Sequence, residues 1–201
     1  PLLETAIAAR HGIGRAPVRE AILRLEYDGL VRRGHRGPQV RTLTAPEVVE
    51  IYQARIALEA EAAASAAAHR SALDLARLRH VHEQASAATE PEQARALHGR
   101  WHAVLRRACH NPTITEILER LALQLALYDS IDMTRSANLE STDEEHTQVL
   151  AAITAGDQNS ARELLRTHLE RTRDVRIAAL VRAEDAPDHA LTPAPERNGS
   201  S

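Results

Sequence analysis

The chain has 201 residues, of which 43% are hydrophobic and 26% charged, so it is not globally disordered and has room for two modest domains. Its formal net charge of −3 argues, taken alone, against a protein that coats nucleic acid. Phenylalanine is absent, so aliphatic residues must build the core, which favours helices over sheets. The single cysteine, Cys109, excludes a disulfide framework and a cysteine-built zinc site.

The net charge hides two regions of opposite sign. Residues 1–43 hold eight arginines and four carboxylates, a net charge of +4, and the other 158 residues carry −7. All 25 basic residues are arginine, whose guanidinium makes forked contacts with phosphates and carboxylates. The sequence has no run of 18 apolar residues and no export signal, so we expect a cytoplasmic protein with no membrane partner.

The basic region predicts two short helices and a hairpin. Residues 3–10 form the first helix, which the His11–Gly12 pair ends, and the second runs from Arg15 to about Gly29. Residues 30–33 and 38–41 predict two strands around a glycine-rich turn. This order is that of a winged helix-turn-helix domain in which the first helix is missing, so residues 1–43 are expected to be an incomplete DNA-binding domain.

The acidic region predicts a mainly α fold, an antiparallel bundle of six helices over residues 44–183. Three of the helices begin at a Ser/Thr-x-x-Glu capping pattern, namely at Thr44, Thr89 and Ser141, and Asp157 caps the last. Residues 184–201 lose all periodicity and predict a disordered tail. The predicted helices span residues 44–69, 71–86, 89–109, 111–132, 141–156 and 157–182.

The basic region resembles the GntR family of bacterial transcription regulators. The family's ordered pattern stands here in residues 4–8, 12–22 and 25–31, followed by Arg36-Gly37. The resemblance implies a homodimer that binds double-stranded operator DNA at an inverted repeat. Two positions depart from the pattern: Gly14 and Ala16 replace a serine and a threonine, which removes two hydroxyl donors for phosphates.

The second helix of this region carries the candidate DNA-reading residues. Arg15 and Arg19 are four residues apart, so they project from one face, where arginine bonds guanine in the major groove. The alternative is that the pair only solvates a helix surface. The resemblance places His35 and Arg36 at the tip of the wing. The predicted DNA-binding residues are Arg15, Ala16, Arg19, His35, Arg36 and Gly37.

Four histidines of the acidic region have a spacing typical of a metal site. His98 and His102 are four apart and point to one side of their helix. His146 lies ten residues before Gly156, and His168 lies eleven after Asp157. An antiparallel pair of helices joined at this short link brings the last two level, so four imidazoles converge inside one bundle.

The acidic region resembles the FCD ligand-binding domain of FadR-type GntR regulators, an all-helical domain that often holds a divalent metal. The resemblance maps the family's ligands onto His98, His102, His146 and His168, and its R-x-x-L-E motif onto Arg55–Glu59. A bundle of six helices is typical of the VanR-like branch. At the first ligand position the family has an aspartate where this chain has His98.

An all-nitrogen ligand set suits a divalent transition metal, with zinc or nickel first, better than magnesium or calcium. Four neutral imidazoles also leave the ion its full charge, which attracts an anion. We therefore expect a small carboxylate effector at the metal, with Arg55 as a weaker candidate for its other end.

These patterns together predict a DNA-binding transcriptional regulator, a repressor in the commoner family behaviour, and not an enzyme. The alternatives are a metal-dependent helical enzyme and a dimerisation or adaptor protein with a vestigial head. An enzyme needs a general base at the metal, but Glu145 adjoins His146 on one helix and points about 100° away from it. The effector signal is expected to pass through the linker at residues 41–44.

Overall fold

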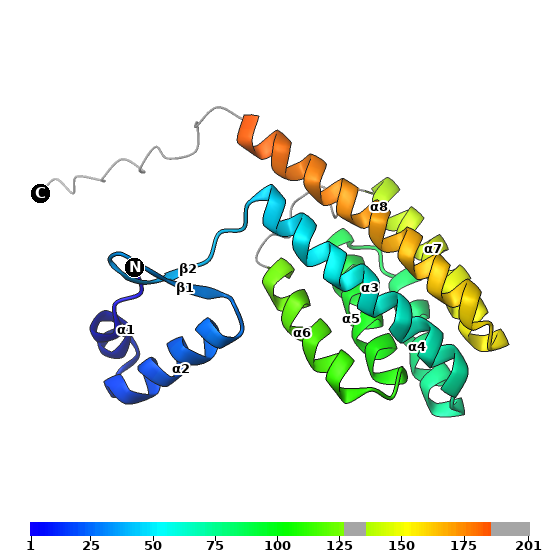
Figure 1. Ribbon diagram of the computed structural model, residues 1–201, viewed down its shortest axis with the longest axis horizontal. Coiled ribbons are helices and arrows are strands. Elements are labelled where there is room, and N and C mark those ends of the chain that lie inside the picture. The colour runs from blue at the N-terminus through cyan, green and yellow to red at the C-terminus, as the bar shows by residue number, and fades with distance from the viewer. Residues whose placement is uncertain (127–135, 186–201) are drawn as a thin grey trace, which may run out of the picture.

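The computed structural model describes residues 1–126 and 136–185, which form a small head and a helical body (Figure 1). The head contains helices α1 (Glu4–His11) and α2 (Arg15–Tyr27) and strands β1 (Val31–Gly34) and β2 (Gly37–Val40). The body contains six helices in the described ranges: α3 (Ala45–His69), α4 (Ala72–Ser86), α5 (Pro91–Ala108), α6 (Pro112–Ala126), α7 (Ser136–Ala155) and α8 (Gln158–Asp185).

The head folds around a small apolar cluster shared by its two helices and its hairpin. Ala8 of α1, Val18 and Ile22 of α2, and Val31 of β1 are buried together. Gly12 ends α1 in the left-handed conformation, with φ of 64°, which turns the chain into α2. Strands β1 and β2 pair antiparallel, and the chain reverses between Gly34 and Gly37. The predicted helix-turn-helix and wing are therefore confirmed.

Helix α3 is the axis of the body. It packs against α5, α6, α7 and α8, and it runs side by side with α8 in the opposite direction (Figure 1). Between Ala60 and Ala67 its buried positions are alanines, whose small side chains let neighbouring helices approach closely. Larger residues complete the core on either side, among them Tyr52 and Trp101, both fully buried. The bundle thus holds its functional side chains in a dense interior.

Of the four helix starts predicted from capping patterns, two are confirmed and two are wrong. Thr44 and Glu47 form the predicted capping box, and Asp157 accepts from the Ser160 amide. The helix predicted from Thr89 has Glu90 as its N-cap, without a side-chain cap, because a residue before proline favours the extended backbone.

The helix predicted from Ser141 begins five residues earlier, at Ser136. The Thr142 hydroxyl donates back to the Asn138 carbonyl inside this helix, so this polar stretch does not mark its start. The predicted fourth helix ends in the described part at Ala126, and residues 127–132 of that prediction lie outside the described residues.

The domain boundaries shift slightly from the predicted ones. Leu43, the last residue assigned to the head, is buried in the core of the body. Helix α8 continues to Asp185, two residues into the predicted tail, and residues 186–201 lie outside the described residues. Among the described helices, none combines the length and the apolar character that crossing a membrane requires.

The turn between α7 and α8 gives a test of the fold. Gly156 has φ of 77°, and a Cβ there would meet the Arg70 guanidinium. We expect Gly156→Ala to lower the free energy of unfolding by about 1–2 kcal/mol, because a left-handed L-residue is strained. Gly99 lies within α5 with open space around its Cα, so Gly99→Ala is the control and should raise stability by roughly 0.5–1 kcal/mol. Urea titrations measure both, and equal midpoints for the two variants would contradict the assignment.

Candidate functional site

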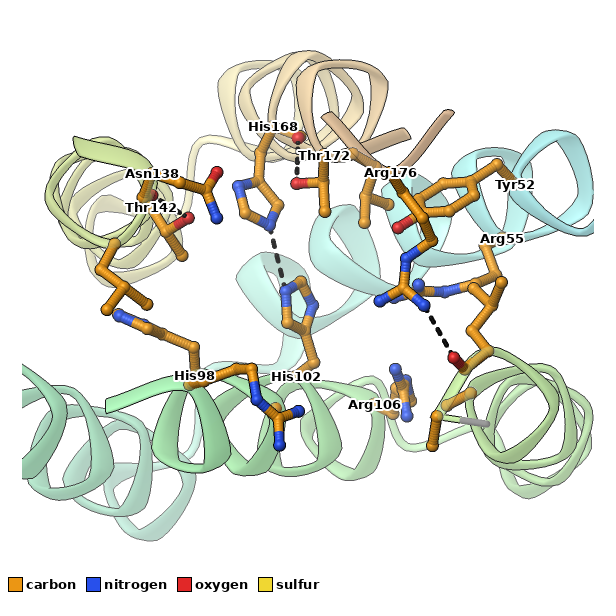
Figure 2. Close-up of a pocket in the computed structure, with 17 residues that line it drawn as sticks. Tyr52, Arg55, His98, His102, Arg106, Asn138, Thr142, His168, Thr172 and Arg176 are labelled. Atoms are coloured by element: carbon orange, nitrogen blue, oxygen red, sulfur yellow. Dashed lines mark hydrogen bonds between the residues drawn. The ribbon is translucent and has the colours of Figure 1, made fainter. Parts of the chain in front are cut away.

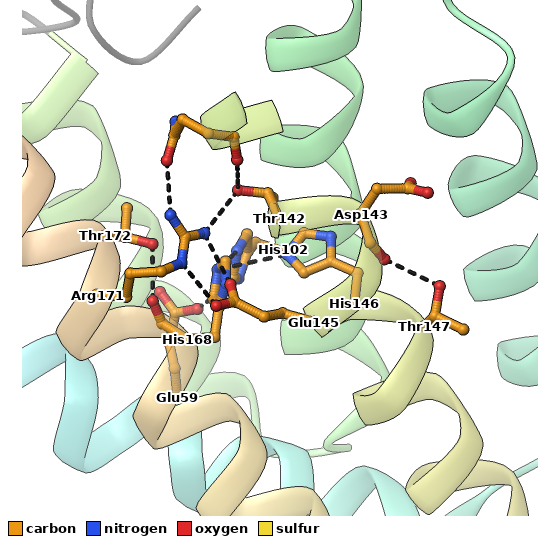
Figure 3. Close-up of polar contacts among 11 residues, drawn as sticks. Glu59, His102, Thr142, Asp143, Glu145, His146, Thr147, His168, Arg171 and Thr172 are labelled. Carbon is orange, nitrogen blue, oxygen red and sulfur yellow. Dashed lines mark hydrogen bonds and ion pairs between the residues drawn. The ribbon is translucent and has the colours of Figure 1, made fainter. Parts of the chain in front are cut away.

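Three buried histidines from three helices converge at the centre of the body. His102 of α5, His146 of α7 and His168 of α8 each offer a ring nitrogen, and these atoms lie within 4.8 Å of one another. The Nε2 atom of His168 is 3.1 Å from that of His102 and 3.4 Å from that of His146 (Figure 3). We call these three residues the histidine triad.

Two carboxylates hold the outer nitrogens of the triad. Glu59 of α3 lies 2.8 Å from Nδ1 of His102, and Glu145 of α7 lies 2.6 Å from Nδ1 of His168. When Nδ1 carries the proton and donates to a carboxylate, the Nε2 lone pair is directed toward the centre. This is the outer-sphere arrangement that orients histidines around a metal ion.

Arginines fix both carboxylates in turn. The Arg55 and Arg106 guanidinium groups reach one oxygen of Glu59 at 2.7 Å and 3.0 Å. Full burial alone would raise the pKa of Glu59, but these two positive charges and His102 hold it well below its ordinary value. Glu59 is therefore a permanent anion in the core of the bundle.

Glu145 has a matching partner on α8. The Arg171 guanidinium donates to both oxygens of Glu145, at 2.6 Å and 2.7 Å, and also to the Asn138 and Thr142 side chains (Figure 3). Partial burial would raise the pKa of Glu145, but the hydrogen bonds from His168 and Arg171 lower it to about 2. The ring of His168 is thus held by the Glu145 carboxylate, which Arg171 fixes with two hydrogen bonds.

His102 and His146 are neutral near pH 7, which is the form of histidine that binds a metal. Burial lowers the pKa of His102 to about 4 and lowers that of His146 well below its ordinary value. Trp101 stacks on the ring of His146 with centroids 4.0 Å apart and an angle of 17°. Sequence analysis had not assigned this tryptophan a role at the site.

His98, the predicted fourth ligand, lies one turn before His102 on α5 but is not part of the three-residue group. Its ring centroid is 5.2 Å from that of His146, and its buried Nδ1 has no hydrogen-bond partner in the described part of the chain. Burial lowers its pKa to about 4. The ligand role of His98 stays a prediction.

The triad borders a cavity of about 180 Å³ inside the body (Figure 2). Arg55, the predicted effector anchor, lines this cavity, but its guanidinium is bonded to Glu59. Other arginines, with His98, His102 and His168, complete the polar wall. Apolar residues of α6 and α8 form the rest, including Ala122, Leu125 and Leu169.

The donor set fits a divalent transition metal. Three imidazole nitrogens at mutual distances below 4.8 Å, each buried, match the ligands that zinc, nickel, cobalt and copper accept. The two outer carboxylates supply the support that such ligands require, since without it the rings would rotate. The residues present are therefore suited to hold such an ion.

The predicted DNA-reading residues lie on two elements of the head, helix α2 and the wing. Arg15, Ala16 and Arg19 are exposed on the first turns of α2, and His35 and Arg36 form the exposed tip of the wing. Gly37 has φ of 105°, which favours glycine at the wing turn. Arg19 is paired with Glu4 of α1 at 3.2 Å, and the hydrogen bond from Arg19 lowers the pKa of Glu4.

The head contacts the body through α6, the body helix on the side of the head in Figure 1. The Arg120 guanidinium donates to the Tyr27 hydroxyl at 3.1 Å and lies 4.6 Å from the centre of its ring. The Gln124 amide donates to the Asp28 carbonyl at 3.1 Å. Gly29 follows with φ of 76°, and a Cβ there would collide with Gln124.

Several residues of the site were missed or left without a role, although helical spacing carries the signal for most of them. Arg106 follows His102 by four residues, and Thr172 and Arg176 follow His168 by four and eight, so each shares a helix face with its histidine. Glu59 was noticed only as the end of a motif. Its role depends on contacts between helices, which spacing along one helix does not reveal.

Comparison with known proteins agrees with both halves of the chain. Residues 1–40 match the family "Bacterial regulatory proteins, gntR family", and residues 50–171 match the FCD domain family.

The uncharacterized HTH-type transcriptional regulator YdhC of Bacillus subtilis is 28% identical over 82% of this chain and 76% of its own length. The HTH-type transcriptional repressor GlaR of Escherichia coli is 26% identical over 81% of this chain and 80% of its own length.

The solved structure of McbR/YncC from E. coli has a TM-score of 0.74 and 26% identity, with 91% of this chain and 87% of that chain covered. A putative GntR regulator from Rhodococcus sp. RHA1, at 23% identity, shares the fold with a TM-score of 0.70, over 89% of this chain and 87% of that chain. The two family matches assign residues 1–40 to a GntR head and residues 50–171 to an FCD body, which agrees with the head and body of the structure. The chain therefore belongs to the gntR family of bacterial regulatory proteins, and it is an FCD-containing transcriptional regulator rather than an enzyme.

Proposed function

We propose that this regulator is a homodimeric repressor that binds an inverted-repeat operator and responds to a small carboxylate at a metal held by the histidine triad. The convergence of three buried imidazoles beside a cavity of the body is the observation that carries the proposal. A repressor role is supported by GlaR and by a probable D-xylose utilization operon transcriptional repressor of Paenarthrobacter nicotinovorans, 27% identical over 84% of this chain and 76% of its own length. Operator binding also implies a cytoplasmic location.

The metal end of the cavity supports binding of an anion. A divalent ion held only by neutral nitrogens keeps its full charge and offers open positions to a carboxylate. Zinc and nickel are the metals we favour. His102 and His168 line the cavity directly, while His146 is not part of its lining and stacks on Trp101. Two of the three triad rings, those of His102 and His168, therefore border the space that an effector would occupy.

Homodimerisation follows from how the head would read DNA. One head presents a single recognition helix, α2, which covers one half-site in the major groove. Two copies related by a two-fold axis match two half-sites in opposite orientation. The chain without this symmetry would have only the contacts of one head.

The effector signal needs a connection between the cavity and the head. The linker supplies one, because Leu43 is buried in the body and Arg41 pairs with Glu47 at 3.0 Å. Helix α6 supplies a second, because Leu125 lines the cavity and the adjacent Gln124 contacts the head. We infer that an effector which shifts α6 also changes the orientation of the head.

Metal loading tests the triad. Purified chain should bind about one zinc ion, whereas His102→Ala and His168→Ala should bind far less, because each removes a nitrogen from a buried three-ligand set. His80 is exposed on α4, so His80→Ala is the control and should load like the wild type. Elemental analysis after dialysis measures the stoichiometry, with circular dichroism as the check on folding. Unchanged loading in both triad variants would refute the site.

The same experiment decides the role of His98. We expect His98→Ala to weaken the zinc affinity without abolishing loading, because the triad remains. An unchanged Kd would remove His98 from the ligand set. Fluorescence of Trp101, the one tryptophan of the sequence, offers a second readout because its ring stacks on His146, so Ni²⁺ or Cu²⁺ should quench it.

Operator binding tests the head. We expect Arg15→Ala to weaken binding to DNA from upstream of the gene by about 5- to 150-fold, as loss of one forked contact with guanine costs about 1–3 kcal/mol. Arg77 is an exposed arginine on α4 of the body, so Arg77→Ala is the charge-matched control. Gel-shift titrations at one fixed salt concentration measure both. Equal affinities of the two variants would contradict the role of Arg15.

The contact through α6 is tested by hydrogen exchange. Arg120→Ala removes the hydrogen bond and the cation–π contact with Tyr27, so amides of residues 28–31 should exchange about two to five times faster, since an exposed cation–π contact contributes roughly 0.5–1 kcal/mol. Glu119 is the neighbouring residue and pairs with Arg107 of the body, so Glu119→Ala is the control. If both variants exchange like the wild type, α6 does not restrain the head.

A further inference from the structure

The cavity beside the triad carries more positive charge than the metal site needs. Its described lining includes four arginines and no carboxylate: Arg55, Arg95, Arg106 and Arg176. Glu59 lies behind this wall and its single negative charge is shared by Arg55, Arg106 and His102. Arg95 also pairs with Glu92 at 3.1 Å, so the lining itself is basic and carboxylates outside it balance part of its charge even before any metal is bound.

The end of the cavity opposite the triad also holds polar donors that the described protein leaves without an acceptor. The hydroxyl of Tyr52 lies beside the Arg55 guanidinium, which is itself a donor, and the hydroxyl and the Nε of Arg106 are buried with no acceptor among the described residues. Figure 2 shows Tyr52, Arg106 and Arg176 together at one end, with His102 and His168 nearer the other. A buried donor without an acceptor is costly, so a ligand oxygen placed there gains affinity.

Arg176 is positioned rigidly at this end. It lies on α8, two turns after His168, and is only 6% exposed. Its Nη1 donates to the Leu125 carbonyl of α6 at 2.7 Å, which fixes the plane of the guanidinium against the cavity wall. A fixed guanidinium loses little entropy when it binds a carboxylate with two parallel hydrogen bonds.

Part of the cavity lining is apolar and the whole space is small. Ala122, Leu125 and Leu169 are among the apolar residues that line it. A volume of about 180 Å³ is below the roughly 300–1,000 Å³ of common ligand pockets, so the ligand is a short molecule. Such a lining suits a few methylene groups with a charged group at each end.

We propose that the effector is a short dicarboxylate, with one carboxylate at the triad's metal and the other held by Arg176 and the Tyr52 hydroxyl. This inference rests on the proposed metal-dependent carboxylate binding and specifies its ligand class. It moves the second anchor from Arg55, which Glu59 engages, to Arg176. A planar carboxylate matches the two-pronged guanidinium, with the hydroxyl as a further donor.

Isothermal titration of the zinc-loaded full chain tests this with pairs of equal carbon number. The probes are malonate, succinate and glutarate, each against propionate, butyrate or valerate. At least one dicarboxylate should bind about tenfold or more tightly than its matched monocarboxylate, since a hydrogen bond to a charged group contributes at least that ratio. If 3-phosphonopropionate binds more tightly than succinate, the dicarboxylate assignment is overturned in favour of a phosphorylated acid.

Two variants locate the second carboxylate. Arg176→Met and Tyr52→Phe should reduce the preference for the dicarboxylate to about twofold or less, with the monocarboxylate affinity and zinc stoichiometry unchanged. Tyr52→Phe removes only a hydroxyl, so it tests the anchor even if Arg176→Met fails to fold. Arg173→Met alters an arginine one turn earlier on α8 that pairs with Asp174, and it should keep the full preference.

The outcomes separate this inference from the proposed function. If no carboxylate binds in a zinc-dependent manner, the proposed carboxylate response fails and the inference fails with it. If each pair binds with equal affinity, the carboxylate response stands and only the second anchor is refuted. A preference that survives both Tyr52→Phe and Arg176→Met would likewise refute the anchor.

Discussion

The burial of one carboxylate, Glu59, is the constraint on which the functional interior depends. An isolated anion in a bundle core is very unfavourable, so the fold must bring it positive partners. Arg55 comes from the same helix, whereas Arg106 and His102 come from α5, so the cluster ties α3 to α5 at a fixed register. Removing the carboxylate would leave two buried guanidinium groups without their anion. The ion cluster of Glu59, Arg55 and Arg106 therefore fixes the orientation of the triad, because His102 bonds the Glu59 carboxylate.

The second half of the site depends on the turn that joins α7 to α8. The short link at Gly156 reverses the chain, so residues at similar distances on either side lie level in the two helices. This places His146 and His168 side by side, and it places Glu145 against Nδ1 of His168. Because α8 also packs along α3, the position of His168 is fixed from two directions. Three helices thus supply one histidine of the triad each, and a fourth, α3, supplies the carboxylate that bonds His102.

Local rules were enough to predict most of the fold and the convergence of three of the four candidate histidines. Helix periodicity, the Thr44 capping box and the count of residues around Gly156 each depend on neighbours in the sequence. The start of α7 was wrong because Ser141 has the residues of a cap but lies in a continuing helix. The arginine cluster around the cavity could not be assigned from sequence, because pairing among arginines, Glu59 and Tyr52 is decided by packing between helices.

In the proposed function, helix α6 connects the cavity to the head. Two consecutive residues of its last described turn contact different partners: the Leu125 carbonyl accepts from Arg176 in the cavity, and the Gln124 side chain donates to the Asp28 carbonyl of the head. A ligand carboxylate bound by Arg176 would share that guanidinium with the Leu125 carbonyl, so the position of this peptide group would respond to the ligand. Because the adjacent Gln124 contacts the head, we infer that such a shift also moves the end of α2. The coupling free energy is therefore limited by these few hydrogen bonds, which matches the roughly 1–3 kcal/mol typical of allosteric regulation.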